Sequence, residues 1–145
     1  MNHDTNVASG ERYAYFEHDA DMGIVGRGVS VEEAFEAAAA AMFAIMTEPA
    51  AVRREQTVQI EFEEDDIELA LVRWLNALLA AARTDGMVFA GFRLERDGVM
   101  WRGSASGERW RDDLERGVEV KGATLTMLSV RQAEAGWEAR CIVDV

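Results

Sequence analysis

Cysteine is nearly absent from the sequence, and Cys141 is the only one in 145 residues. A single cysteine excludes an internal disulfide and a metal cluster held by several thiolates. A reducing compartment fits this composition, and the strand-like context of Cys141 favours a small buried residue over a reactive thiol. Proline is equally scarce, and no Pro/Ser-rich linker divides the chain. We therefore expect one domain over residues 12–145, preceded by a poorly ordered polar tail over residues 1–11.

Long hydrophobic runs are also missing. The uncharged run over residues 37–46 has ten residues, about half of what a membrane-spanning helix needs. No basic segment followed by an apolar one opens the chain, so a secretory signal is not predicted. We expect a cytoplasmic protein that makes no membrane contact.

Positive charge is scarce, with 15 Lys and Arg against 27 Asp and Glu and a net charge of −12. Proteins that bind nucleic acid directly use Lys and Arg to neutralise phosphates, and no basic cluster is visible here. Direct nucleic-acid binding is therefore not expected, and a role near RNA would depend on a partner protein or a metal ion. The acidity also has a simpler explanation, which is solubility.

Two helices are indicated by apolar residues at helical spacing. The first follows Ser30, which with Glu33 forms a capping box. The second begins near Asp65 or Asp66 and ends at Gly86, a residue typical of helix C-termini.

The remaining sequence is strand-like. Polar and apolar residues alternate over residues 58–63, and Asp97-Gly98 is a hairpin signal. Residues 119–131 are predicted to be extended, and after a turn at residues 134–136 a last strand continues to residue 145. Two helices among mostly consecutive strands predict an α+β fold, with a mostly antiparallel sheet and both helices packed on one face.

Acidic residues surround a histidine near the N-terminus, where Glu17, Asp19 and Asp21 flank His18. In an extended chain Asp19 and Asp21 project to the same side, and their charges repel unless a cation lies between them. Simpler roles remain open: Asp21 as a turn or cap residue, Asp19 as a solvent-facing residue, and His18 as a hydrogen-bonding residue that orders its strand. At the other end of the chain, Asp144 and the α-carboxylate of Val145 lie together at the end of a strand.

Five segments resemble the archease family in order and spacing. They are residues 16–24 (FEHDADMGI, similar to H-T-A-D-x-G), 30–47 (similar to the first helix of the family), 74–79 (WLNALL, similar to W-L-N-x-L-L), 119–124 (EVKGAT, similar to E-V-K-A-V-T) and 136–145 (GWEARCIVDV, similar to G-W-x-A…D-I). The five segments are distributed over nearly all of the chain after Tyr13, so the resemblance covers that whole region.

The resemblance implies a fold built around a strand–helix–strand–strand unit, and a function. Archeases assist an RtcB-type RNA ligase of tRNA splicing and RNA repair, by promoting guanylylation of its active-site histidine and repeated turnover. The protein would then be an activator and not itself an enzyme.

The resemblance also implies a site. The family's metal ligands correspond to Asp21 and Asp144, with the α-carboxylate of Val145 as a helper, and its functional lysine corresponds to Lys121. His18 and Asp19 would lie in the surroundings of the metal. Carboxylate oxygens suit a hard divalent cation such as Ca²⁺, Mg²⁺ or Mn²⁺. Beside such a cation, Lys121 would meet a nucleotide phosphate or a carboxylate of the ligase; on composition alone it would be a solvated strand residue.

The sequence departs from the family pattern at two places. The family's Thr is Asp19 here, and its Tyr-His after the E-V-K segment is replaced by Leu125-Thr126. The second departure keeps open a metal-independent interaction or chaperone-like module. A small metal-dependent hydrolase is a further alternative, although no phosphate-binding loop supports it. The acidic run over residues 61–66 predicts a solvated edge and helix cap, or a second surface for a partner.

Overall fold

The computed structural model describes residues 12–145, and the predicted tail over residues 1–11 lies outside them. In this part of the chain two α-helices and a short 3-10 helix are joined with eight strands. In chain order they are β1 (Tyr13–His18), β2 (Asp21–Gly28), α1 (Val31–Met46), η1 (Pro49–Ala51), β3 (Gln56–Glu63), α2 (Ile67–Asp85), β4 (Met87–Asp97), β5 (Met100–Arg109), β6 (Gly122–Ala123), β7 (Ser129–Ala133) and β8 (Gly136–Asp144).

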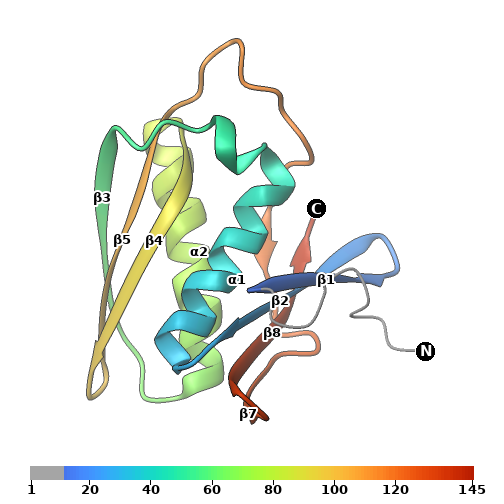
Figure 1. Ribbon diagram of the computed structural model, residues 1–145, viewed down its shortest axis with the longest axis vertical. Coiled ribbons are helices and arrows are strands. Elements are labelled where there is room, and N and C mark those ends of the chain that lie inside the picture. The colour runs from blue at the N-terminus through green and yellow to red at the C-terminus, as the bar shows by residue number, and fades with distance from the viewer. Residues whose placement is uncertain (1–11) are drawn as a thin grey trace.

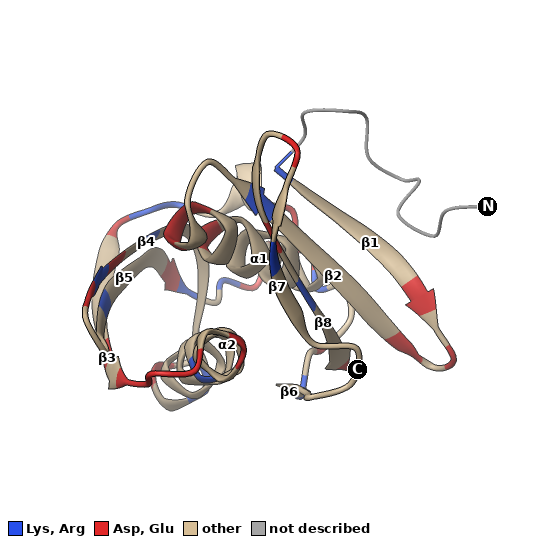
Figure 2. Ribbon diagram, turned by 90° about the horizontal axis from the view of Figure 1, so that it is seen from below, with Lys and Arg blue, Asp and Glu red and all other residues tan. Residues whose placement is uncertain are grey.

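The strands form two antiparallel sheets. The larger sheet has the order β1-β2-β8-β6, with β7 also paired to β8, and the smaller has the order β3-β5-β4. Figures 1 and 2 show α1 and α2 lying between them. The predicted α+β class is confirmed, but the strands divide into two sheets instead of one, so each sheet turns one face toward the helices.

Local sequence signals set the helix ends. The Ser30 hydroxyl accepts a hydrogen bond from the Glu33 N–H, and Asp66 accepts two at the start of α2, which satisfies N–H groups that have no partner within the helix. Gly86 ends α2 in the left-handed conformation (φ 61°) that glycine adopts without strain.

The predicted extended stretch over residues 119–131 is mostly irregular. Only the two residues of β6 and the start of β7 pair within it. The backbone groups of residues 120–123 are satisfied partly by side chains of α2 and not by a long run of strand pairing.

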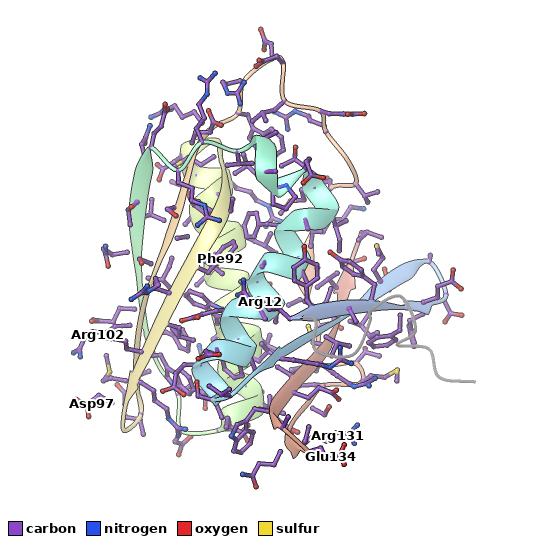
Figure 3. All side chains as sticks on the ribbon, in the orientation of Figure 1. Arg12, Phe92, Asp97, Arg102, Arg131 and Glu134 are labelled. Carbon is purple, nitrogen blue, oxygen red and sulfur yellow. The ribbon has the colours of Figure 1, made fainter. Side chains whose placement is uncertain are left out.

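The core fills the space between the sheets. Trp74 of α2 and Trp101 of β5 are fully buried, and Phe35 of α1 stacks on Trp101 with ring centroids 5.3 Å apart. Phe92 of β4 points toward α1 (Figure 3), where its ring lies 5.4 Å from that of Phe43. These aromatic contacts join α1 to the smaller sheet.

Helix α1 lies very close to β2 of the larger sheet. A Cβ atom added at Gly26 would be 2.2 Å from the carbonyl oxygen of Ala34, so only glycine permits this approach. The alanine-rich face of α1 also permits this close approach to β2, because small side chains let a helix approach a strand closely. The first strands are thereby fixed against the core.

The two α-helices of residues 12–145 do not meet the length and hydrophobicity that a membrane span requires.

Candidate functional site

The β1–β2 hairpin carries the acidic residues around the histidine. Strand β1 ends at His18, the turn consists of Asp19 and Ala20, and β2 begins at Asp21. Asp19 has a positive φ of 52°, which aspartate tolerates in tight turns. The assumption that Asp19 and Asp21 share one side of an extended chain is therefore wrong, because the chain reverses between them. Figure 2 shows the acidic tip of this hairpin.

Asp21 instead meets the end of the last strand. Strands β2 and β8 pair antiparallel with Met22 opposite Val143, so the next positions, Asp21 and Asp144, come opposite each other. Opposite residues of an antiparallel pair project to the same face. The Val145 N–H donates to Asp21 Oδ1 over 3.5 Å, which places the final residue directly beside the Asp21 carboxylate.

His18 lies across the hairpin from Asp21. Its Nδ1 atom is buried and has no hydrogen-bond partner among the described residues. An unsatisfied buried nitrogen is unusual because it loses its hydration without compensation. The hairpin therefore presents an imidazole nitrogen, available to a ligand or a water molecule, next to a half-buried carboxylate.

Lys121 joins the same strand end through its backbone. Its N–H donates to the Asp144 carbonyl over 2.7 Å, and the following residue, Gly122, is paired with Asp144 in β6. The side chain is exposed, and no ion pair with another residue of the described chain is present. Lys121 is also the only lysine of the protein, since the other fourteen basic residues are arginines.

Two residues of α2 hold the segment that carries Lys121. Asn76 makes both amide hydrogen bonds to the backbone of Ala123, at 2.9 and 3.2 Å. Arg83 donates to the carbonyls of Val120 (3.1 Å) and Lys121. Neither residue was predicted to take part in the site. Asn76 lies in the W-L-N motif, which was a usable signal, whereas nothing in the sequence singles out Arg83.

The donor atoms at this strand end suit a hard cation only in part. Asp21, Asp144 and the α-carboxylate of Val145 supply oxygen atoms, and His18 supplies one nitrogen. Ca²⁺ takes about six to eight oxygen ligands, and within residues 12–145 no group of three or more His, Cys, Asp or Glu side chains is arranged to hold a metal ion. The fit therefore depends on the α-carboxylate and on ligands from outside residues 12–145.

The residues that replace the family's Tyr-His lie between β6 and β7, beside β8. Thr126 accepts a hydrogen bond from the Ile142 N–H (3.3 Å) through its carbonyl. Leu125 and Met127 on either side are 64% and 55% exposed. Met127 also has a positive φ of 52°, a conformation uncommon for residues other than glycine.

The acidic run over residues 61–66 is largely engaged in local structure. Glu61 pairs with Arg102 (2.7 Å) and Glu64 with Arg73 (2.6 Å), while Asp66 caps α2. The hydrogen bond from Arg73 lowers the pKa of Glu64 below its ordinary value. These contacts agree with the prediction of a solvated edge and helix cap.

Comparison with known proteins gives one consistent result. A model of the archease protein family matches residues 13–145. The chain is 34% identical to protein archease of Sulfolobus acidocaldarius over 137 residues, which cover 92% of this chain and 99% of the relative. It is 33% identical to protein archease of Methanosarcina mazei over 144 residues, which cover 95% and 99%.

The fold has a counterpart among solved structures. The solution structure of protein 1598 from Methanobacterium thermoautotrophicum superposes with a TM-score of 0.84 at 32% sequence identity. The match covers 92% of this chain and 99% of that one.

Proposed function

Because this chain belongs to the archease family, we propose that it activates an RtcB-type RNA ligase and is not itself a catalyst. In this proposal it promotes guanylylation of the ligase's active-site histidine and repeated turnover in tRNA splicing or RNA repair. It acts through protein–protein contact, which agrees with its net charge of −12.

One observation supports the proposed site most directly: the start of β2 meets the end of the last strand. The hydrogen bond between Val145 and Asp21 joins residues 124 positions apart. Two aspartates, an α-carboxylate and the backbone of Lys121 thus gather at one strand end. Carboxylates so close together repel each other, and this repulsion favours binding of a divalent cation.

Each residue of the site has a role in this proposal. Asp21 and Asp144 bind the cation with help from the Val145 carboxylate, and His18 orients or supplements them. A bound divalent cation supplies a positive centre that can hold an anionic oxygen of the ligase or its nucleotide. The Lys121 ammonium adds a second positive charge for the same phosphate or carboxylate. Because residues 12–145 supply only part of a ligand set, the partner completes the site in this proposal.

A second candidate function is a metal-independent interaction module of the same fold. It is favoured by the absence of a cluster of three metal-binding side chains in the described residues and by the exposed Leu125 and Met127. In that case the ligase, or another partner, would recognise the exposed apolar side chains between β6 and β7 and not a cation.

Ligase guanylylation with GTP, measured with and without the protein, tests the proposal. We expect Asp21→Asn and Asp144→Asn to abolish most of the stimulation, because each removes one charged ligand. Asp112→Asn is the matched control, since Asp112 is exposed in the loop that follows Trp110. A well-folded wild type that gives no stimulation contradicts the proposal, and full stimulation by both site variants favours the metal-independent module.

A further inference from the structure

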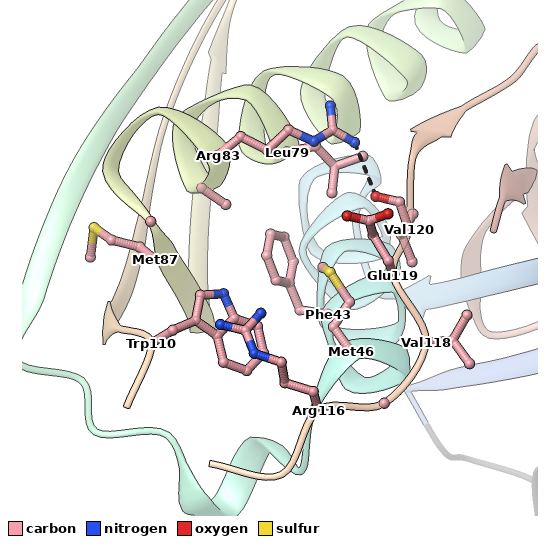
Figure 4. A pocket seen from close by; sticks show the side chains of 13 residues that line it. Phe43, Met46, Leu79, Arg83, Met87, Trp110, Arg116, Val118, Glu119 and Val120 are labelled. Atoms are coloured by element: carbon pink, nitrogen blue, oxygen red, sulfur yellow. Dashed lines mark hydrogen bonds between the residues drawn. The ribbon is translucent and has the colours of Figure 1, made fainter. Parts of the chain in front are cut away.

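A pocket opens at the C-terminal end of α2, beside the segment that carries Lys121. Its volume is about 340 Å³, near the lower end of the roughly 300–1,000 Å³ of ligand pockets. Apolar side chains of both helices form its floor, including Phe43, Met46 and Leu79, and Trp110 forms one wall. Figure 4 shows these side chains facing a common space, with Arg116 and Glu119 at the mouth, and Val118 also belongs to the lining. Such a space suits one or two apolar side chains better than a large cofactor.

The pocket is held open by hydrogen bonds on each side. The Trp110 N–H donates to the Gly86 carbonyl (3.0 Å), and the Gly117 N–H donates to the Met46 carbonyl (2.7 Å). On the α2 side, Arg83 donates to Val120, the contact drawn in Figure 4. Because the walls are fixed to both helices, an occupant would not need to order them first, which favours binding.

The mouth of the pocket carries one cation and one anion. The Arg116 guanidinium lies over the Trp110 ring, 4.0 Å from its centroid, and the Glu119 carboxylate is at the opposite rim (Figure 4). Neither has an ion-pair partner in the part of the chain that the structure describes. A hydrogen-bond donor and an acceptor at the mouth of an apolar pocket match the C=O and N–H groups of a peptide backbone around an apolar side chain.

The pocket is continuous with the proposed site. Glu119 and Val120 line it, and Lys121 follows immediately. Arg83 contacts the backbone on both sides of this junction, since it bonds both Val120 and Lys121. A chain segment bound in the pocket therefore lies next to the backbone that carries Lys121.

We propose that this pocket receives a large apolar side chain from an extended peptide segment of the RNA ligase, and so anchors the ligase beside Lys121. This inference rests on the proposed function for the identity of the partner. It adds an anchoring contact to the cation-dependent one, and such buried apolar anchors contribute most of the affinity in many interfaces.

Direct binding of the purified ligase, measured by isothermal titration calorimetry, tests this anchor. Val118 lines the pocket and is 50% exposed, and Val118→Glu would place a charge where the apolar side chain enters. Ala82→Phe would fill the pocket from α2. We expect both changes to raise the Kd by about tenfold or more. Val29→Glu, at a valine 73% exposed on the β2–α1 connection, and Ala80→Phe, at an exposed alanine of α2, are the matched controls and should leave the Kd unchanged.

The outcomes separate this inference from the proposed function. If the wild type binds tightly and Val118→Glu binds equally well, the pocket contact is overturned and the proposed function is not. This result can be obtained from Val118→Glu even if Ala82→Phe does not fold. A wild type that neither binds nor stimulates the ligase overturns both proposals. The oligomeric state of the protein alone is measured by analytical ultracentrifugation. If the wild type self-associates and Val118→Glu does not, a second copy of the chain occupies the pocket, and the inference is overturned.

Discussion

Lys121 is the only basic residue of the protein that is not an arginine, and its backbone bonds to Asp144 at the candidate site. A chain that uses arginine at fourteen of its fifteen basic positions has a lysine where the last strand, α2 and the candidate site meet. Lysine presents a compact ammonium group, whereas arginine presents a planar fork that needs more room and bonds differently. We infer that this position requires the smaller cation.

Lys121→Arg tests that requirement because it keeps the charge. We expect ligase stimulation to fall by about tenfold, because losing a hydrogen bond to a charged group costs about 1.5 kcal/mol or more, while cation binding at Asp21 and Asp144 persists. The measurements are ligase guanylylation and titration calorimetry with Mn²⁺. Arg131→Lys on β7 is a control for the exchange of the two residue types. Full stimulation by Lys121→Arg would show that charge alone is needed.

Cys141 gives a prediction at the same scale. It is fully buried in β8, and burial raises the pKa of its thiol from an ordinary value of 9.0 to about 12. The thiol of the unfolded chain therefore ionises first, so its contribution to stability is complete below about pH 9 and is lost as the pH rises toward 12.

We expect the free energy of unfolding of the wild type to fall by about 1 kcal/mol more than that of Cys141→Ala between pH 8 and pH 10. Urea unfolding at the two pH values measures the difference. Comparing the two proteins at each pH removes the contribution of Tyr15, whose pKa burial also raises. Equal losses in both proteins would contradict a raised thiol pKa.

Helix α2 has a role beyond packing. Its buried face carries Trp74 and Leu75 into the core, while Asn76 and Arg83 on exposed positions bind the backbone on both sides of Lys121. The helix thereby replaces the strand pairing that the segment around β6 lacks. We infer that α2 positions Lys121 relative to Asp144.

Arg83→Met should loosen this segment without unfolding the protein. Labelling with ¹⁵N-lysine gives one amide signal, because Lys121 is the only lysine. We expect its hydrogen exchange to accelerate by about tenfold, since the N–H bond to Asp144 opens more often. Arg73→Met is the matched control on the same helix, because Arg73 pairs with Glu64 instead. Equal exchange in both variants would show that Arg83 does not hold the segment.

At the scale of the whole molecule, charge governs what the protein can approach. A net charge of −12 repels the phosphate backbone of RNA. Three of the cations are also partly neutralised, because Arg27, Arg131 and Arg140 all surround Glu138 on the larger sheet, at 3.0–3.5 Å. We therefore expect any contribution to RNA ligation to come through the ligase.

Fluorescence anisotropy with a labelled tRNA tests this expectation. We expect no binding by the protein alone at about 0.15 M salt, where exposed charges are screened beyond roughly 8 Å. The ligase with the same tRNA is the positive control. A Kd in the micromolar range for the protein alone would contradict the proposal that the ligase, and not this protein, binds the RNA.

The sequence alone determined the helices and most of the turns, and it indicated the residues of the candidate site. The Ser30 cap, the Gly86 stop and the Asp97-Gly98 turn are local signals, because each satisfies or redirects the backbone within a few residues. The motif around Asp21 and the segment around Lys121 were recognisable for the same reason. In both segments the order of residue types along the chain is enough to recognise the motif.

Tertiary structure decided the arrangement of these parts. Whether Asp21 meets Val145 depends on the register of β2 and β8, which are separated by most of the chain, and on the turn at Asp19 that sets where β2 begins. The division into two sheets depends on α1 fitting against Gly26 on one side and the aromatic residues of the smaller sheet on the other. Contacts across such distances in sequence are fixed by packing and pairing, and no local pattern encodes them.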